Sequence, residues 1–74
     1  MQKIKQLFNE IGKNDITEFH NDLVFGGFID SVDIISLVSL IEDKYKISID
    51  FDEIVPENFY NFQTIMEMIC KMQK

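Results

Sequence analysis

The chain has 74 residues, of which 46% are hydrophobic, enough for the core of one domain near the lower size limit. No apolar run approaches the roughly 20 residues of a membrane span, and the single cysteine excludes an internal disulfide. A formal net charge of −6 argues against nucleic acid and anionic lipid as partners.

The charge is unevenly distributed along the chain. Residues 30–57 hold eight acids and two lysines, whereas the rest of the chain carries five acids and five lysines. A segment of this kind attracts basic protein surfaces, although a merely solubilising acidic face has the same composition.

The first predicted helix lies near residues 2–12. Its apolar residues recur at the helical spacing i, i+3, i+4 and i+7, namely Ile4, Leu7, Phe8 and Ile11. Gly12 follows directly and suits the position just past a helix end.

Residues 13–29 show no sustained period and predict a long loop that packs its own apolar side chains: Ile16, Phe19, Leu23, Val24, Phe25 and Phe28. A loop of this length in so small a domain is more often functional than idle. Gly26 and Gly27 allow it to turn sharply before the next helix.

The start of the second helix is strongly specified. Asp30 suits the N-cap, where its carboxylate accepts backbone N–H groups of the first turn. Ile29 and Ile34 have the spacing of a hydrophobic staple across this cap. Asp33 falls at N3, where a negative charge matches the helix dipole. Ser31 is therefore expected in the first turn with its hydroxyl facing water, although it could also be a second capping residue.

The second helix is predicted over residues 31–46, with two different faces. The face assigned to the core consists of Ile34, Leu37, Val38, Ile41 and Tyr45. The other mixes aliphatic, hydroxyl and acidic side chains and is predicted to bind partner proteins: Val32, Ile35, Ser36, Ser39, Glu42 and Asp43. The alternative is a helix buried on two sides.

The last third of the chain continues the helical pattern. Residues 47–51 alternate like a strand without a partner run, so we expect an extended connector that turns Ile47, Ile49 and Phe51 inward. Pro56 favours a one-turn helix over residues 56–60. Asn61 is a suitable N-cap for a final helix near 61–73. Its expected inward stripe consists of Phe62, Ile65, Met66, Ile69 and Met72.

These elements predict one all-α domain over residues 1–74. It is a small bundle of three main helices plus one short helix, with a long loop between the first and second helices.

The run from Phe25 to Asn58 resembles the acyl and peptidyl carrier proteins, and the similarity extends over nearly the whole chain. The matching stretches are Gly27-Phe28-Ile29-Asp30-Ser31, Leu37-Val38, Leu40-Ile41-Glu42-Asp43, Tyr45-Lys46-Ile47-Ser48-Ile49, Phe51-Asp52-Glu53-Ile54-Val55-Pro56-Glu57-Asn58-Phe59 and Thr64-Ile65. Val32 departs from the family, which more often has Leu or Met there. Residues 56–59 look closer to the discrete carriers of secondary metabolism or envelope modification than to the carrier of fatty-acid synthesis.

The resemblance implies a function. Ser31 would be modified with 4′-phosphopantetheine, taken from coenzyme A by a phosphopantetheinyl transferase with Mg²⁺, and Asp30 would cap the helix beside it. The thiol of the arm would carry an acyl or aminoacyl group as a thioester. Other expected partners are a loading enzyme and a downstream transferase with basic docking surfaces. The protein would be a cytoplasmic monomer and a substrate of other enzymes, with no catalytic residues of its own.

The residues themselves offer little for other chemistry. One histidine, His20, and one cysteine, Cys70, fall short of the four ligands of a zinc site. Cys70 is expected at the edge of the core. The acids of residues 50–53 lack the glycine and spacing of a calcium loop, so we expect a solvated acidic turn and no metal site.

Two other functions fit the same sequence. One is a carrier-like fold that acts only as a noncovalent adaptor through Val32, Ile35, Glu42 and Asp43. The other is a small acidic inhibitor of a basic partner, such as an antitoxin.

Residues 1–5 lack the apolar region of a signal peptide, in agreement with the cytoplasmic expectation.

Overall fold

The helices follow the predicted order. A computed structural model describes residues 2–73 and contains, within them, three α-helices and two 3₁₀ helices without any strand. They are α1 (Gln2–Glu10), α2 (Ser31–Tyr45), η1 (Phe51–Glu53), η2 (Pro56–Phe59) and α3 (Phe62–Met72). The all-α prediction is therefore confirmed, with α-helix ends within two residues of those expected. The predicted domain also included Met1 and Lys74, which lie outside the described residues.

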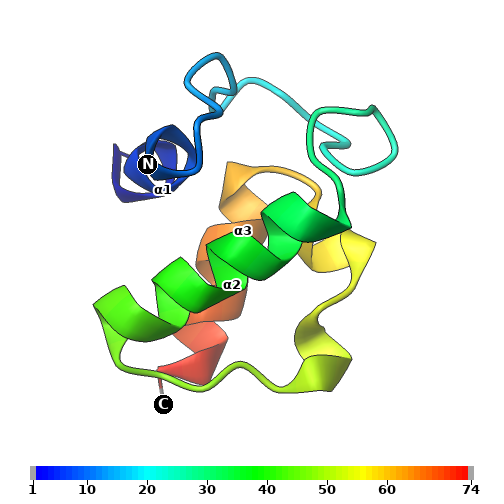
Figure 1. The fold of residues 1–74 in the computed structure, drawn as a ribbon. Helices are drawn as coiled ribbons and strands as arrows, with labels where there is room; N and C mark the ends of the chain where they lie inside the picture. The colour runs from blue at the N-terminus through cyan, green and yellow to red at the C-terminus, as the bar shows by residue number, and fades with distance from the viewer. Residues whose placement is uncertain (1, 74) are drawn as a thin grey trace.

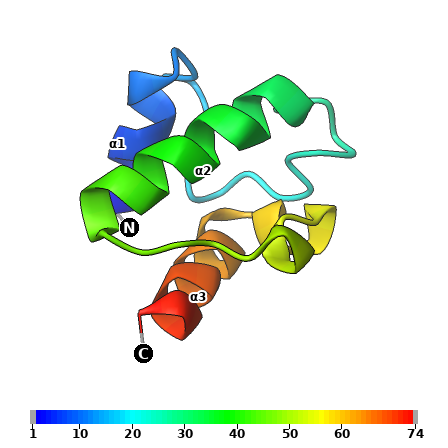
Figure 2. The same cartoon turned by 60° about the horizontal axis from the view of Figure 1, so that its bottom comes forward.

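The helices pack around one core, to which all three α-helices contribute. α1 packs against both α2 and α3, and η2 packs against α3. At the centre, the rings of Phe8 and Phe62 stack with centroids 4.9 Å apart and an interplanar angle of 19°. Burial of apolar side chains such as these is the dominant favourable term in folding. The turn of the long loop, the start of α2 and both 3₁₀ helices lie at the same end of the molecule (Figures 1 and 2).

Helix ends are formed by local bonds that the sequence specifies. Gly12 adopts a φ of 84° after α1, and the Lys13 N–H donates to the Phe8 carbonyl at 2.8 Å. This is the pattern of a Schellman motif, which satisfies the last carbonyls of a helix. Asn61 caps α3 as predicted: its side chain accepts from the Thr64 N–H, and the Thr64 side chain accepts from the Asn61 N–H.

Leu23 anchors the long loop to the rest of the domain. Its side chain is fully buried, and its N–H donates to the Tyr60 carbonyl at 3.1 Å. Its own carbonyl accepts the N–H groups of Phe28 and Ile29, at 2.9 and 3.0 Å. One residue thus joins the middle of the loop to the end of η2 and to the entry of α2.

Several predicted side-chain orientations were wrong, in the connector after α2, in the long loop and in α3. Phe51 is 85% exposed because it begins η1, which turns the chain away from the core after Ile49. The loop buries Ile16 and Leu23 but leaves Phe19 and Phe25 exposed. Two assignments in α3 also change. Met68 belongs to the buried set, whereas Cys70 is exposed instead of lining the core edge.

Candidate functional site

The first turn of α2 is held by a reciprocal capping box. The Asp30 carboxylate accepts the Asp33 N–H at 3.0 Å, and the Asp33 carboxylate accepts the Asp30 N–H at 3.2 Å. The hydrogen bond from the Asp33 N–H favours the charged form of the Asp30 carboxylate. It is the main reason why the pKa of Asp30 lies below its usual value. The predicted N-cap is confirmed, and the two carboxylates together fix where α2 begins.

Ser31 is the first residue of α2 and is exposed. Since Asp30 and Asp33 supply both side-chain bonds of the cap, the Ser31 hydroxyl is not used in it. The staple residue Ile29 is buried, and Ile34 packs against the core, so the chain enters the helix at a fixed angle. The result is an exposed primary hydroxyl on a rigid helix end, at the positive pole of the helix dipole.

The approach to Ser31 is a tight turn that requires glycine. The Gly26 N–H donates to the Asp22 carbonyl at 2.6 Å, and a Cβ added at Gly26 would lie only 2.5 Å from that oxygen. Gly27 has a φ of 83°. After this turn, the Phe28 ring packs against the His20 ring with centroids 4.8 Å apart. His20 is itself engaged, because its Nδ1 accepts the Thr17 N–H at 2.9 Å.

A lysine that the sequence patterns did not single out also reaches this turn. Lys13 Nζ lies 3.4 Å from the Asp33 carboxylate, and the Asp33 side chain is only 17% exposed. Lys13 follows Gly12 directly, so its backbone is fixed by the Schellman motif of α1. The ion pair therefore joins the end of α1 to the first turn of α2 across the long loop. Only the spatial proximity of the two helices reveals it.

The face predicted to bind partners is largely exposed. Val32 and Ile35 are 68% and 64% exposed and form an apolar surface beside Ser31. Ser39 and Asp43 are also exposed, while Ser36 is partly buried. Glu42 has a structural role instead, because its carboxylate accepts the Ile49 N–H at 2.8 Å and holds the connector after α2. The acidic rim of this face along α2 is therefore carried by Asp43 more than by Glu42.

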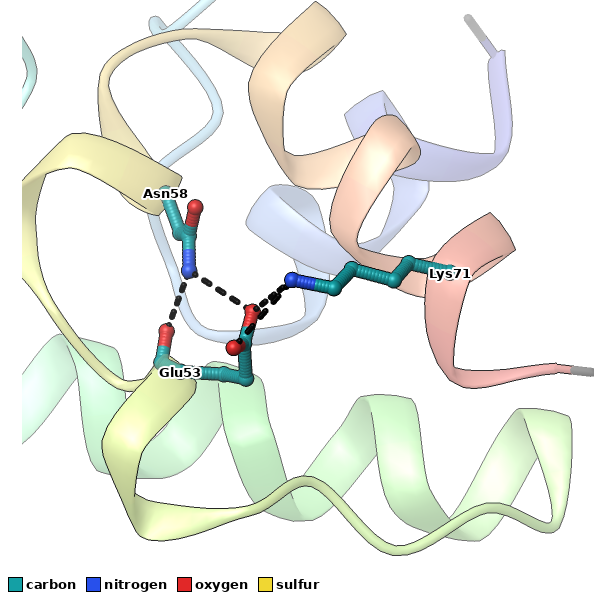
Figure 3. A network of polar contacts seen from close by, with 3 residues as sticks. All are labelled: Glu53, Asn58 and Lys71. Atoms are coloured by element: carbon teal, nitrogen blue, oxygen red, sulfur yellow. Dashed lines mark hydrogen bonds and ion pairs between the residues drawn. The ribbon is translucent and has the colours of Figure 1, made fainter.

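The two 3₁₀ helices are joined by a polar network around Glu53. The Asn58 amide donates to the Glu53 backbone carbonyl at 2.6 Å and to its carboxylate at 3.4 Å. Lys71 of α3 lies 3.3 Å from both carboxylate oxygens (Figure 3). The network holds η1 against η2 and α3, which fixes the position of the exposed Phe51 at the start of η1. Glu53 is thus bound by Asn58 and Lys71 of the same chain. Asp50 and Asp52 are exposed, as expected for a solvated acidic turn.

Other kinds of site find little support in the described residues. Across residues 2–73 there is no group of three or more His, Cys, Asp or Glu side chains that could hold a metal ion. None of the described helices has the length and apolar character needed to cross a bilayer. Two open hollows of about 280 and 300 Å³ lie elsewhere. One is lined by Lys3, Gln6, Lys44 and Tyr45, and the other by Gln2, Lys5, Thr17, Glu18, Phe19 and Phe62.

The comparisons with known proteins identify no relative. No protein-family model, curated protein or solved structure matches the chain.

Proposed function

We propose that this protein is an acyl or aminoacyl carrier whose Ser31 is modified with 4′-phosphopantetheine. The proposal rests on the resemblance of residues 25–58 to carrier proteins. The observation that carries it is the exposed Ser31 hydroxyl at the first position of α2, left unused by the Asp30 cap. When attached, the arm supplies a thiol that holds the transported group as a thioester.

The surroundings of Ser31 are compatible with such an arm. Attachment needs no enclosed pocket, only a hydroxyl that a second enzyme can reach, and neither of the two hollows described above is lined by residues of this turn. A phosphodiester on Ser31 would lie at a helix N-terminus, where the dipole favours negative charge. The adjoining carboxylates of Asp30 and Asp33 oppose that preference. Asp30 is engaged as a cap and is not a general base in this proposal.

In the proposed modification, coenzyme A is the donor of the arm. The Ser31 oxygen forms a bond to the phosphorus that bears the pantetheine, and the pyrophosphate bond to that phosphorus breaks. Adenosine 3′,5′-bisphosphate leaves, and the hydroxyl proton goes to a base of the transferase. The carrier contributes position alone: a rigid helix start that presents one oxygen.

Partner enzymes would dock on the face of α2 beside Ser31. Val32 and Ile35 provide the apolar contact, Ser36 and Ser39 a polar margin, and Asp43 a charge for basic groups on the partner. In this function the protein is a monomer and works in the cytoplasm, where it meets coenzyme A and the transferase.

Intact-protein mass spectrometry tests the proposal. The purified protein is incubated with a broad-specificity phosphopantetheinyl transferase, Mg²⁺ and coenzyme A, with an established carrier as the positive control. We expect a mass gain of one arm, located on the peptide that contains Ser31. An unmodified protein beside a modified control would contradict the carrier function. In that case the exposed Val32 and Ile35 surface favours the noncovalent adaptor.

A further inference from the structure

The charge balance around Ser31 points to a role for Lys13. The first turn of α2 already contains two carboxylates, those of Asp30 and Asp33, that accept each other's backbone N–H. A phosphodiester on Ser31 would add a third anion to the same turn. Like charges at such short range destabilise one another unless a cation lies among them.

Lys13 is the cation placed to offset them. Within residues 2–73, the other two lysines in ion pairs are bound elsewhere: Lys44 lies 3.0 Å from Glu10, and Lys71 binds Glu53. Among the lysines that the structure describes, Lys13 alone pairs with a residue of the first turn of α2, at 3.4 Å from Asp33. Its backbone is fixed by the N–H bond to the Phe8 carbonyl at 2.8 Å, so the lysine is anchored beside this turn.

The Lys13 side chain retains freedom to change partner. It is 36% exposed, and its flexible aliphatic stem lets the ammonium turn among nearby acceptors. An ammonium donates well to phosphate oxygens as well as to carboxylates. The ion pair with Asp33 therefore holds a cation at the first turn of α2, the turn that begins with Ser31, before modification takes place.

We propose that Lys13 is the counter-cation of the phosphodiester formed on Ser31, a role that rests on the proposed function. In the unmodified protein Lys13 is bound by Asp33. After modification it turns to the phosphodiester oxygens and offsets the added charge. It is thus a binding residue for the arm's phosphate, contributed by the end of α1.

The test compares the thermal stability of unmodified and modified protein. Wild type, Lys13→Met and Lys44→Met are each prepared in both forms, and the melting temperature is measured at about 0.1 M salt. The quantity of interest is the change in melting temperature on modification. Lys44→Met is the matched control because it also removes one charge and one exposed ion pair between α1 and α2. Lys44 lies 13 residues along α2 from Ser31, which is a distance of about 20 Å. This distance exceeds the Debye length of about 10 Å at 0.1 M salt.

We expect modification to lower the melting temperature of Lys13→Met by about 2–4 °C more than that of wild type or Lys44→Met. Salt at 1 M should remove this excess. The same change on modification in all three proteins would overturn the role of Lys13, while leaving the carrier function intact. Failure of wild type to be modified would overturn both.

A second variant separates the counter-cation from a purely structural ion pair. Asp33→Asn breaks the same pair from the other side but leaves the ammonium free for the phosphodiester. Modification should therefore not lower its melting temperature more than that of wild type. A drop on modification as large as in Lys13→Met would show that it follows from breaking the pair and not from losing the ammonium. If Lys13→Met does not fold, Lys13→Gln, which also removes the charge, takes its place with the same expected result.

Discussion

The carboxylates of Asp30 and Asp33 each accept the other's backbone N–H, at 3.0 and 3.2 Å, and enclose the first turn of α2 on which Ser31 lies. Because the bonds are reciprocal, two donors that a helix start normally leaves free are both satisfied. The position of Ser31 is thereby fixed without use of its own hydroxyl.

The capping box should make the fold sensitive to acid. The folded state lowers the pKa of Asp30, so its charge stabilises the fold above the unfolded-state pKa of about 4. That contribution is lost as the pH falls through the lower folded-state value. Asp30→Asn keeps an amide cap but removes the charge, so its melting temperature should lie below that of wild type at pH 7. The difference should shrink as the pH falls through the lowered pKa of Asp30.

Asp43→Asn serves as the control for this titration. Asp43 lies in the last turn of α2, where the helix dipole disfavours a negative charge. Its removal should therefore raise the melting temperature slightly or leave it unchanged at pH 7. A lower melting temperature for Asp43→Asn than for Asp30→Asn would mean that the cap charge does not set the stability of α2.

The aromatic core should tolerate little change at Phe62. Phe62 is 1% exposed and stacks on Phe8, so Phe62→Ala should lower the free energy of unfolding by about 3–5 kcal/mol. Phe51→Ala, at a side chain that is 85% exposed, should change it by no more than about 0.5 kcal/mol. Urea denaturation followed by circular dichroism measures both, and a similar loss for the two variants would refute the placement of Phe51.

The Glu53 network predicts unequal roles for its two donors. Asn58→Ala leaves a partly buried carbonyl without its partner and should cost about 1–3 kcal/mol of unfolding free energy. Lys71→Met removes an ion pair whose lysine side chain is 60% exposed, so it should cost at most about 1 kcal/mol. Equal losses in chemical denaturation would show that the ion pair, and not the amide, holds η1.

Electrostatic steering should depend on one face of the molecule. Asp43→Lys reverses an exposed charge on α2 and should slow modification by a basic transferase at low salt, mainly through a lower encounter rate. Glu67→Lys reverses an exposed charge on α3 and should have a much smaller effect. Initial rates at low and high salt decide the matter. Glu42 is left intact because its carboxylate holds the Ile49 N–H. Equal rates for both variants would mean that partners recognise shape alone.

The sequence predicted what depends on local pattern. The Asp30 and Asn61 caps, the Gly12 helix end and the stripe of Leu37, Val38 and Ile41 are confirmed because each follows from neighbours within one or two turns. These features also place Ser31, so the exposure of the candidate site could be expected from the sequence.

What the sequence did not predict depends on contacts between distant segments. The bond from Ile49 to Glu42 and the pair between Lys13 and Asp33 join residues whose proximity follows only from the packed fold. The orientation of Phe51 depends on η1, a single 3₁₀ turn that has no apolar periodicity to reveal it. In α3 the expected stripe packs against the core, but Met68 is buried with it and Cys70 is exposed, because the width of the buried face depends on how the other helices cover it.

The most direct measurement is intact mass spectrometry of Ser31→Ala beside Ser36→Ala and Ser39→Ala after incubation with the transferase and coenzyme A. The three variants remove the same atom from one helix, but only the first removes the hydroxyl at the helix start. Ser31→Ala should remain unmodified while its free energy of unfolding changes by at most about 1 kcal/mol, since Asp30 supplies the cap. Ser36→Ala and Ser39→Ala should gain the full mass of the arm. An arm attached to folded Ser31→Ala, or absent from Ser36→Ala and Ser39→Ala, would contradict the assignment of Ser31 as the attachment site.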